Sequence, residues 1–479
     1  MSKLNVLVEE CSSNHFKCIN TKIMEVLKAW QNTPDIGWTK TNNYIWETYH
    51  SKPEHFNFIS VEDFKEEDKL NPTIYLVTIP FINDHLNTTW VRWLPDSTLK
   101  LLKENNIPIV LSQPHEYFLG HLEHFSYHHF YPSEEMARLS SVLDQKGLFT
   151  NDIIIHGISA TSSKPGFMGV GHRKVYEAYC YDYFANGKRF IDDWTGHDLT
   201  NPKMARYKYL TFRDHYNEGI NKDKTSVCFN RQPRDLRCLL LLCCEAELDS
   251  SVFTFLAEDP INVPMTNDDI EQRLNDILDS LPQSKYVNKL RRSIIPLINK
   301  MPLELQELEG ERVDHMNANY ALNQERKRAW FEMVTETHEW NKKDLAVSII
   351  TEKTIWPIVN NMPFCVQGHK ENYEFLKNLG FNLFEDSLLN QEALKRDIIH
   401  EDLDKSSLFA TEQMYERFNA WYKNIKFLQD AKAQIKHNFE LLAHTDWKAK
   451  EKDDFIKICN HSKRSVSSSD IFLENKFKF

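Results

Sequence analysis

Arginine side chains gather in one turn of the sequence, NRQPRDLR, between an apolar strand-like run and an apolar helix-like run. Pro233 suits the first position of a helix, because its missing N–H would have no intrahelical partner there. Arg234 and Arg237 then share one face near the helix start, where cations oppose the helix dipole unless an anion is bound. Helix N–H groups and guanidinium forks together suit a diphosphate. We assign this anion site to Asn230, Arg231, Arg234 and Arg237. The alternative is that the arginines pair with surface carboxylates or line a domain interface.

A second block, SIITEKTIWPIV, reads as a strand that leads into a short helix. Thr351 is a good N-cap residue, which places Glu352 and Lys353 in the first helical turn. A glutamate there can accept two hydrogen bonds from a ribose diol, and the lysine can neutralise a phosphate. The alternative is that the glutamate complements the helix dipole and the lysine is solvated. We assign Thr351, Glu352, Lys353 and Thr354 to the same ligand as the arginine turn.

A third acidic side chain, Glu336, follows the strand-like run 330–334. At the end of that strand it could reach the same ligand, so we add Glu336 to the predicted binding residues. A solvated loop carboxylate is the alternative interpretation.

The elements that must position these side chains alternate between strands and helices in the first half of the chain. Continuous apolar strands separated by amphipathic helices are typical of a mostly parallel sheet covered on both faces. We therefore predict a Rossmann-like domain over residues 1–215. Its expected strands are Asn5–Val8, Thr73–Phe81, Ile107–Ser112 and Asp152–Ser159, and its expected helices are Thr21–Trp30, Asp96–Asn105 and Ser133–Lys146.

The same alternation returns in the second half, and it predicts a second α/β domain over residues 216–403. Residues 404–479 are Lys-, Glu- and Leu-rich and are predicted to form C-terminal helices and a tail. Expected strands are 226–229, 251–257, 330–334, 345–350 and 363–366, with a final short one at 381–384; expected helices are 233–247, 265–281, 287–300 and 371–379.

Three blocks of the second half resemble known enzymes. The TEKT helix and the PF strand after it resemble the donor-binding segment of α1,3-fucosyltransferases. Together the blocks are similar to those of glycosyltransferase-like proteins of large bacteriophages, over roughly residues 205–440. The matching residues are Asn230, Arg231, Pro233, Arg234 and Arg237 in the first block, Glu352, Lys353, Thr354, Pro357, Pro363 and Phe364 in the second, and Leu376, Leu379, Gly380, Phe381 and Phe384 in the third.

The resemblance implies a GT-B-like α/β fold, with two Rossmann-like domains and the donor nucleotide held mainly by the second. It implies a glycosyltransferase that moves a sugar from a nucleotide-diphosphate sugar, its co-substrate, to an acceptor hydroxyl. Such an enzyme needs no protein-bound metal, because arginine, lysine and helix N-termini can stabilise the leaving diphosphate.

An inverting enzyme of this kind also needs a general base to deprotonate the acceptor. In this architecture the base comes from the N-terminal, acceptor-side domain. We favour Glu10, which follows the first strand, or His115, which follows IPIVLS; His156 within DIIIHGIS is a further candidate. A structural role is the alternative for each, and a retaining enzyme could work without such a base.

The net charge of −11 argues against a protein that coats nucleic acid. If the acceptor is a hydroxymethylated base in phage DNA, a local basic patch is required, whereas a protein or glycan acceptor requires none. Candidates for the patch are Arg173, Lys174, Lys188, Arg189, Arg206 and Lys208.

The alternative function is that of a non-enzymatic binding or virion-associated protein on a degenerate glycosyltransferase scaffold.

Cysteine usage and hydropathy indicate the compartment. The nine cysteines are odd in number and several stand in apolar runs, which favours buried free thiols in a reducing compartment. There is no signal-peptide pattern, and no apolar stretch approaches the ~20 residues of a membrane span. We expect a cytoplasmic protein, in the host cytoplasm if it is viral, with no membrane partner.

Overall fold

A computed structural model of the 479-residue chain describes two compact units. Unit 1 comprises Met1–Ala185 and Asp446–Phe479, and unit 2 comprises Asn186–Thr445. We predicted a boundary at 215/216, whereas the chain divides between Ala185 and Asn186 and again between Thr445 and Asp446. The structure describes residues 3–8, 54–78, 91, 94–113, 132–157, 159–160, 167–170, 173–194, 211–216, 222–230, 235–255, 265–281, 283–301, 303, 323–336, 348–367, 370–384 and 431–464.

Unit 1 is built on a seven-stranded sheet with the strand order β2-β1-β3-β4-β5-β8-β7. Neighbouring strands are parallel except at one edge, where β7 runs antiparallel to β8. The strands are β1 (Leu4–Val8), β2 (Phe56–Ser60), β3 (Thr73–Thr78), β4 (Ile109–Gln113), β5 (Ile153–Gly157), β7 (Phe167–Val170) and β8 (Arg173–Tyr179).

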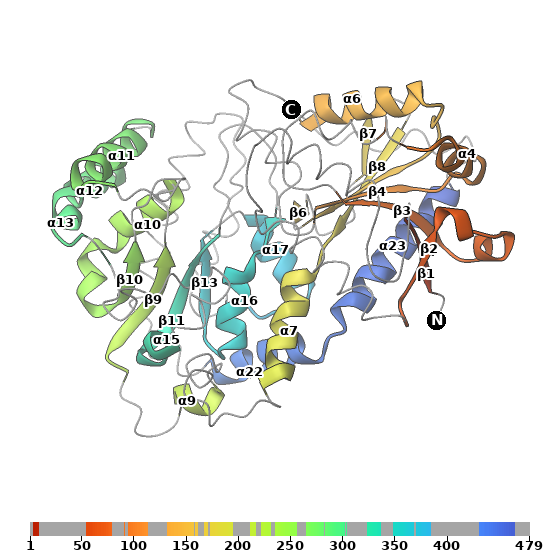
Figure 1. The fold of residues 1–479 in the computed structure, drawn as a ribbon. Coiled ribbons are helices and arrows are strands. Elements are labelled where there is room, and N and C mark those ends of the chain that lie inside the picture. Colours follow the sequence, from red (N-terminus) through yellow and green to blue (C-terminus); the bar gives the residue numbers. More distant parts are fainter. Residues whose placement is uncertain are drawn as a thin grey trace. The chain divides into compact units, whose positions relative to one another are not determined.

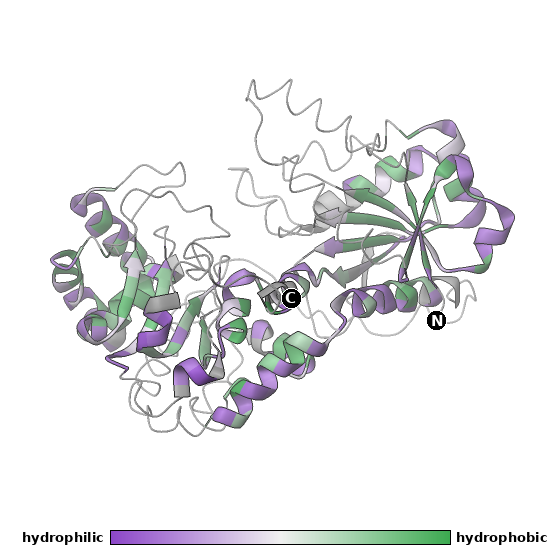
Figure 2. Ribbon diagram, turned by 60° about the horizontal axis from the view of Figure 1, so that its bottom comes forward, coloured by the Kyte–Doolittle hydropathy of each residue, from purple (hydrophilic) through white to green (hydrophobic). Residues whose placement is uncertain are grey.

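Successive residues of these strands point to opposite faces of the sheet, and both faces are apolar. In β4, Ile109 and Leu111 pack on one face and Val110 on the other. The first face is covered by α4 (Asp96–Asn105) and α6 (Pro132–Gln145), and the second by α23 (Trp447–Arg464). Figure 2 shows the resulting green strands between helices of mixed hydropathy.

Helix α23 belongs to the core of unit 1 although it comes from the far end of the chain. Its side chains Phe455, Ile458 and Cys459 are at most 3% exposed and pack with β1, β4, β5 and β8. The remaining elements of unit 1 are η1 (Val61–Asp63), η2 (Glu66–Leu70) and β6 (Ser159–Ala160), and α7 (Asp182–Trp194) begins in unit 1 and continues in unit 2.

Unit 2 holds a four-stranded, fully parallel sheet with the order β10-β9-β11-β13. These strands are β10 (Val252–Phe255), β9 (Lys224–Asn230), β11 (Ala329–Thr335) and β13 (Phe364–Gln367). The other elements are α9 (Phe212–Tyr216), α10 (Asp235–Cys244), η3 (Glu245–Ser250), α11 (Asn267–Asp279), α12 (Lys285–Arg292), α13 (Ile294–Ile298), α15 (Asn323–Arg328), β12 (Ser348–Ile349), α16 (Glu352–Val359), α17 (Lys370–Asn378) and α22 (Lys432–His444).

These two parallel sheets and the C-terminal helices confirm the predicted α/β class. The helix expected at 96–105 has those bounds, but the strand expected at 381–384 is wrong. There the Asn382 backbone N–H donates to Asn438 Oδ1 at 2.7 Å, and Asn438 Nδ2 donates to the Asn382 backbone carbonyl. A side chain of α22 thus takes the backbone hydrogen bonds that a neighbouring strand would form. The helix expected at 21–30 lies outside the described residues.

The prediction of buried thiols is confirmed for the cysteines that the structure describes, which are buried and form no disulfide bond with one another. Among the described helices, none combines the length and apolar character that crossing a membrane would require.

Candidate functional site

The order in which the chain visits the strands of unit 2 reverses between the parallel neighbours β9 and β11. From β9 the chain continues through α10 to the outer strand β10, whereas from β11 it continues through α16 to β13 on the other side. Connections that leave neighbouring parallel strands in opposite directions create the place where open α/β sheets bind ligands, at the carboxyl ends of the strands. Asn230 ends β9 and Thr335 ends β11, so both lie at this point.

Asn230 is a buried connector between these strand ends. Its side chain is 4% exposed, and its Oδ1 accepts a hydrogen bond from the Thr335 hydroxyl. Its backbone N–H donates to Thr254 Oγ1 at 3.1 Å, which ties the end of β9 to β10 as well. Thus Asn230 fixes the point from which the arginine turn departs.

Glu336 follows β11 directly and holds the start of α16. The Thr351 backbone N–H donates to Oε1 at 3.1 Å and the Thr351 hydroxyl to Oε2 at 2.6 Å, while the Thr354 hydroxyl also donates to Oε1. The residue is 1% exposed, so its carboxylate is used inside the protein. Burial raises the pKa of this carboxyl, although Lys353 and the two threonines oppose the shift.

The N-terminus of α16 is capped as the sequence predicts. Thr351 Oγ1 accepts from the Lys353 backbone N–H at 3.3 Å, which confirms Thr351 as the N-cap residue. Thr351 and Thr354 are buried, while Glu352 and Lys353 between them are only half-buried. The first turn of α16 therefore presents one acidic and one basic side chain beside backbone N–H groups, an arrangement that suits an anionic, hydroxyl-bearing ligand.

The structure describes only part of the predicted arginine turn. Arg237 lies in the first turn of α10 and is 4% exposed, and its charge opposes the rise that burial gives to the pKa of the Cys228 thiol. Arg231 and Arg234 belong to the segment that joins β9 to α10 and lie outside the described residues, as do Glu10 and His115.

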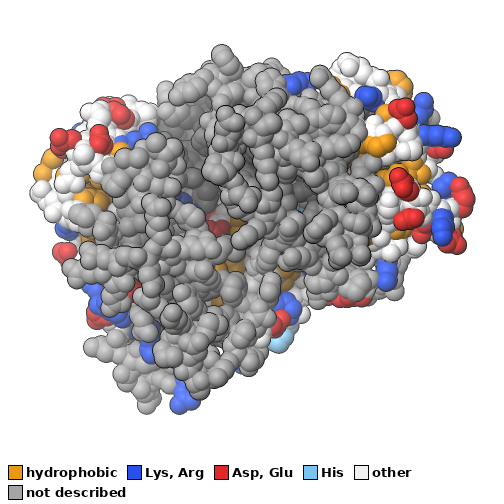
Figure 3. Space-filling view, viewed as in Figure 1, with side chains coloured by type: hydrophobic (Ala, Val, Ile, Leu, Met, Phe, Trp, Pro, Cys, Tyr) orange, Lys and Arg blue, Asp and Glu red, His pale blue; other side chains and the backbone are white. Residues whose placement is uncertain are grey.

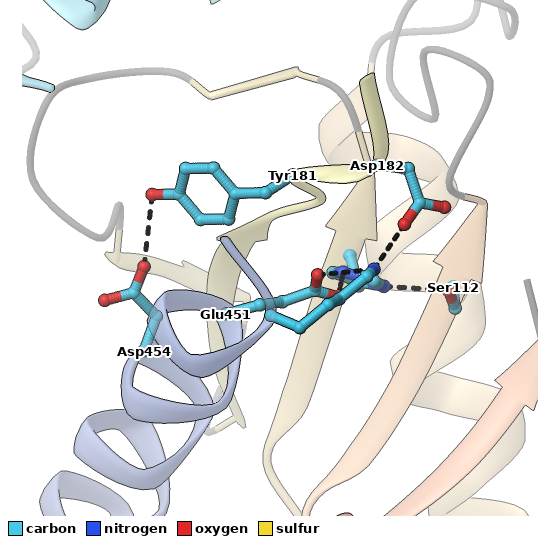
Figure 4. A network of polar contacts seen from close by, with 7 residues as sticks. Ser112, Tyr181, Asp182, Glu451 and Asp454 are labelled. Atoms are coloured by element: carbon cyan, nitrogen blue, oxygen red, sulfur yellow. Dashed lines mark hydrogen bonds and ion pairs between the residues drawn. The ribbon is translucent and has the colours of Figure 1, made fainter. Parts of the chain in front are cut away.

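A second polar cluster lies at the carboxyl ends of β4 and β5 in unit 1 (Figure 4). Ser112 Oγ and His156 Nδ1 are 2.8 Å apart, and His156 Nε2 is 2.7 Å from Glu451 Oε1. The other carboxylate oxygen of Glu451 accepts from Lys448 Nζ at 2.9 Å, and the same ammonium donates to Asp182 Oδ1. We call Ser112, His156, Asp182, Lys448 and Glu451 the α23 network.

Each member of the α23 network is at most 2% exposed, so a substrate has no access to it in this state. Burial lowers the pKa of the Lys448 ammonium, but Asp182 and Glu451 outweigh that cost and raise the pKa above its ordinary value. The network thus keeps its charges paired inside the protein.

Three possible metal ligands occur within this region. The ligand atoms of His156, Cys180 and Glu451 lie within 4.8 Å of one another. However, burial raises the pKa of the Cys180 thiol, and the nearby Lys448 ammonium would repel a divalent cation. Both oxygens of Glu451 already accept hydrogen bonds or ion pairs, so the group suits an internal ion-pair network better than a metal centre.

Most of the described polar residues at the carboxyl edge of unit 2 were predicted from the sequence, but Thr335 was not. Its signal was available, because Thr335 is the last residue of the apolar run AWFEMVT and is thus placed at a strand's carboxyl end. Lys448 and Glu451 were also missed, since in the sequence they look like ordinary surface residues of a charged helix.

Comparison with known proteins adds little to this geometry. No protein-family model matches the chain, and no curated protein sequence matches it. Among solved structures, the chain is similar to an α,α-trehalose-phosphate synthase (UDP-forming) from Burkholderia vietnamiensis, at 12% sequence identity and a TM-score of 0.35. That alignment covers 98% of this chain and 100% of the other. The fold class described above rests on the two parallel sheets themselves.

Proposed function

We propose that this protein is a glycosyltransferase, which transfers a sugar from a nucleotide-diphosphate sugar to an acceptor hydroxyl. The observation that carries the proposal is the pair of contacts at the carboxyl edge of unit 2. Thr335 bonds Asn230, where the arginine turn begins, and the next residue, Glu336, bonds Thr351, where α16 begins. Two motifs about 120 residues apart in the sequence thereby depart from one sheet edge, where α/β proteins bind nucleotides.

In this proposal the donor is held by groups of complementary chemistry. Arg231 and Arg234 bind the diphosphate through guanidinium forks, and Lys353 adds a further positive charge. Glu352 accepts hydrogen bonds from the ribose hydroxyls. Asn230, Arg237, Glu336, Thr351 and Thr354 are buried, so they support these groups from beneath the site.

The reaction breaks the bond between the sugar C1 and the diphosphate oxygen and forms a bond from C1 to the acceptor oxygen. The leaving diphosphate gains negative charge, which the arginines, Lys353 and the N-terminus of α16 stabilise. In an inverting reaction the acceptor proton passes to a base, for which Glu10 and His115 remain our candidates. No protein-bound metal is required for these steps.

The described residues of the predicted basic patch bear on the nature of the acceptor. A hydroxymethylated base in phage DNA would need a basic surface, but Arg173, one of the six proposed contributors, is 2% exposed and bonds Asp144 Oδ1 at 2.6 Å. Lys188 donates to the Ala443 carbonyl and lies 3.6 Å from Asp192. Figure 3 shows acidic and basic side chains interspersed over α4. These observations weaken the DNA acceptor and leave a protein or glycan as the alternative.

The donor site is tested by thermal unfolding with UDP, GDP, ADP, CDP and TDP in turn. A nucleotide at 100 times its dissociation constant should stabilise the protein by about 2.7 kcal/mol. The double variant Arg234→Ala/Lys353→Ala should lose this stabilisation and the slow hydrolysis of the matching nucleotide sugar, scored by mass spectrometry. Arg292→Ala/Lys436→Ala removes the same charge from exposed positions and should retain both.

Two results would contradict the proposal. A chain that none of the five nucleotides stabilises would favour the alternative, a non-enzymatic binding or virion-associated protein on a degenerate scaffold. Stabilisation that survives in Arg234→Ala/Lys353→Ala would place the nucleotide elsewhere in the molecule.

A further inference from the structure

A glycine stands in the interior of helix α7, where it is unfavourable for the helix itself. Gly187 is buried in the middle of α7, and glycine costs about 1 kcal/mol relative to alanine at such positions. Its backbone adopts ordinary helical geometry, so the local conformation does not demand glycine. The reason lies in what packs against it.

Two other helices of unit 2 meet α7 at this glycine. A Cβ at position 187 would lie 2.5 Å from Ile355 Cγ2, 3.2 Å from Leu442 Cδ2 and 3.5 Å from Val359 Cγ2. Ile355 and Val359 belong to α16, and Leu442 belongs to α22. A separation of 2.5 Å is far inside van der Waals contact, so a methyl group here would force a neighbour to move.

The neighbour that must move is α16. Ile355 is 2% exposed and β-branched, so its Cγ2 follows the helix backbone and cannot swing aside easily. Val359 and Leu442 are at most 1% exposed, which leaves little space to absorb a shift. The added volume would therefore displace α16 as a body.

Displacement of α16 reaches the candidate site directly. Ile355 lies one helical turn from Thr351 and Glu352, and Lys353 is two residues before it. The same turn is anchored to Glu336 through Thr351 and Thr354, at hydrogen-bond distances that tolerate little stretching. A shift at Ile355 would thus move the first turn or break its anchor.

We propose that Gly187 is a positioning residue, which lets α7 approach α16 closely. This close approach holds Glu352 and Lys353, in the first turn of α16, where they can contact the nucleoside diphosphate. This inference rests on the proposed function, because it names what sets the geometry of the same site. Since a misplacement of about 1 Å can cost a hundredfold in an enzyme, even a partial shift is measurable.

The experiment measures the dissociation constant of the nucleoside diphosphate that stabilises the wild-type chain, by calorimetry. Gly187→Ala should weaken binding by about tenfold or more. Leucine has no methyl group on Cβ, so Ile355→Leu removes the Cγ2 atom that would clash with the new Cβ. The double variant Gly187→Ala/Ile355→Leu should therefore recover most of the lost affinity. A general loss of packing would not be repaired in this specific way.

A second pair of variants serves if Gly187→Ala does not fold. Ile355→Ala leaves a void beside Gly187 and loosens α16, which should weaken nucleotide binding several-fold. Leu297→Ala truncates a residue of α13 that is 0% exposed in the same unit, and it should destabilise the protein without changing affinity.

The outcomes separate the two proposals. If the wild-type chain binds none of the five nucleoside diphosphates, the proposed function fails. If the wild type binds one and Gly187→Ala binds it equally well, the function stands and the role of Gly187 is overturned. Weakened binding that Ile355→Leu does not restore, or equal affinities in Ile355→Ala and wild type, would also overturn it.

Discussion

Two buried polar clusters lie at carboxyl ends of parallel strands, one in each unit, and they are built differently. In unit 1 the α23 network encloses full charges of both signs, with Lys448 between Asp182 and Glu451. In unit 2 the carboxylate of Glu336 is held by neutral hydroxyls and a backbone N–H, and the charged residues beside it, Glu352 and Lys353, are half-buried.

The difference indicates what each cluster does. Charges that pair with one another out of reach of solvent link α23 to the sheet and to α7, and removing one of them would leave its partners buried and uncompensated. Glu336 instead uses its carboxylate to fix a helix N-terminus, and Glu352 and Lys353 in the first turn of that helix are half-buried. The strand ends of unit 1 near β4 and β5 are therefore structural, whereas those of β9 and β11 suit binding.

The largest expected effect on stability comes from a substitution that breaks the α23 network. Lys448→Met removes the ammonium between two buried carboxylates and should lower the free energy of unfolding by about 3–5 kcal/mol, measured by urea denaturation. Lys457→Met is the matched control, because Lys457 is 69% exposed, pairs with Asp454 at 3.0 Å, and should lose about 0.5 kcal/mol or less.

Hydrogen exchange locates the effect of Lys448→Met. Amides of α23 should lose protection while those of β9 and β11 keep theirs, because only unit 1 contains the network. A stability loss no larger than that of Lys457→Met would mean that apolar packing alone, through Phe455 and Ile458, holds α23 in place.

The intermediate effect concerns Glu336. Glu336→Gln keeps the size of the side chain but turns one acceptor into a donor, so one of the three hydrogen bonds at the start of α16 is lost. The expected cost is about 1–3 kcal/mol in the free energy of unfolding. Glu440→Gln, on an exposed residue of α22, is the control and should change little.

The pH dependence of this substitution has a defined sign. The pKa of Glu336 in the folded protein is raised above its ordinary value of 4.5. The contribution of this group to the free energy of unfolding is therefore complete below pH 4.5, and it falls as the pH rises through the pKa of the folded protein. Glutamine does not titrate, so the difference in unfolding free energy between wild type and Glu336→Gln should narrow as the pH rises above 4.5. A gap that widens over that range would show that the hydrogen bonds, which favour the ionised form, outweigh burial.

Local patterns in the sequence predicted much of the fold. The apolar runs of β3, β4, β5 and β9 are strong strand signals because parallel strands are buried on both faces. Thr351 as an N-cap was also predictable, since capping depends on residues adjacent in the chain. Each of these features is decided within a few residues.

Features decided by distant partners were not predictable in this way. Arg173 looks like a surface cation at the start of the alternating run RKVYEAY, yet it is buried among Asp144 Oδ1, Ser140 Oγ and the carbonyls of Asn151 and Leu148. Lys448 and Glu451 lie in a Lys- and Glu-rich helix. They are three residues apart, a spacing that is the same for an exposed ion pair as for a buried one. Only the packing of α23 on the sheet distinguishes the two.

The smallest expected effect tests the link between β9 and β11. Thr335→Val removes the hydroxyl that donates to Asn230, at a cost of about 1 kcal/mol, and Thr335→Ser keeps the hydroxyl but deletes a buried methyl group at a similar cost. The two variants are thus matched in stability and differ in the hydrogen bond. Because Asn230 fixes the start of the arginine turn, Thr335→Val alone should weaken nucleoside diphosphate binding several-fold by calorimetry. Equal affinities in the two variants would show that the turn keeps its position without this bond. The contrast between the proposed binding edge in unit 2 and the α23 network in unit 1 would then rest on Glu336 and α16.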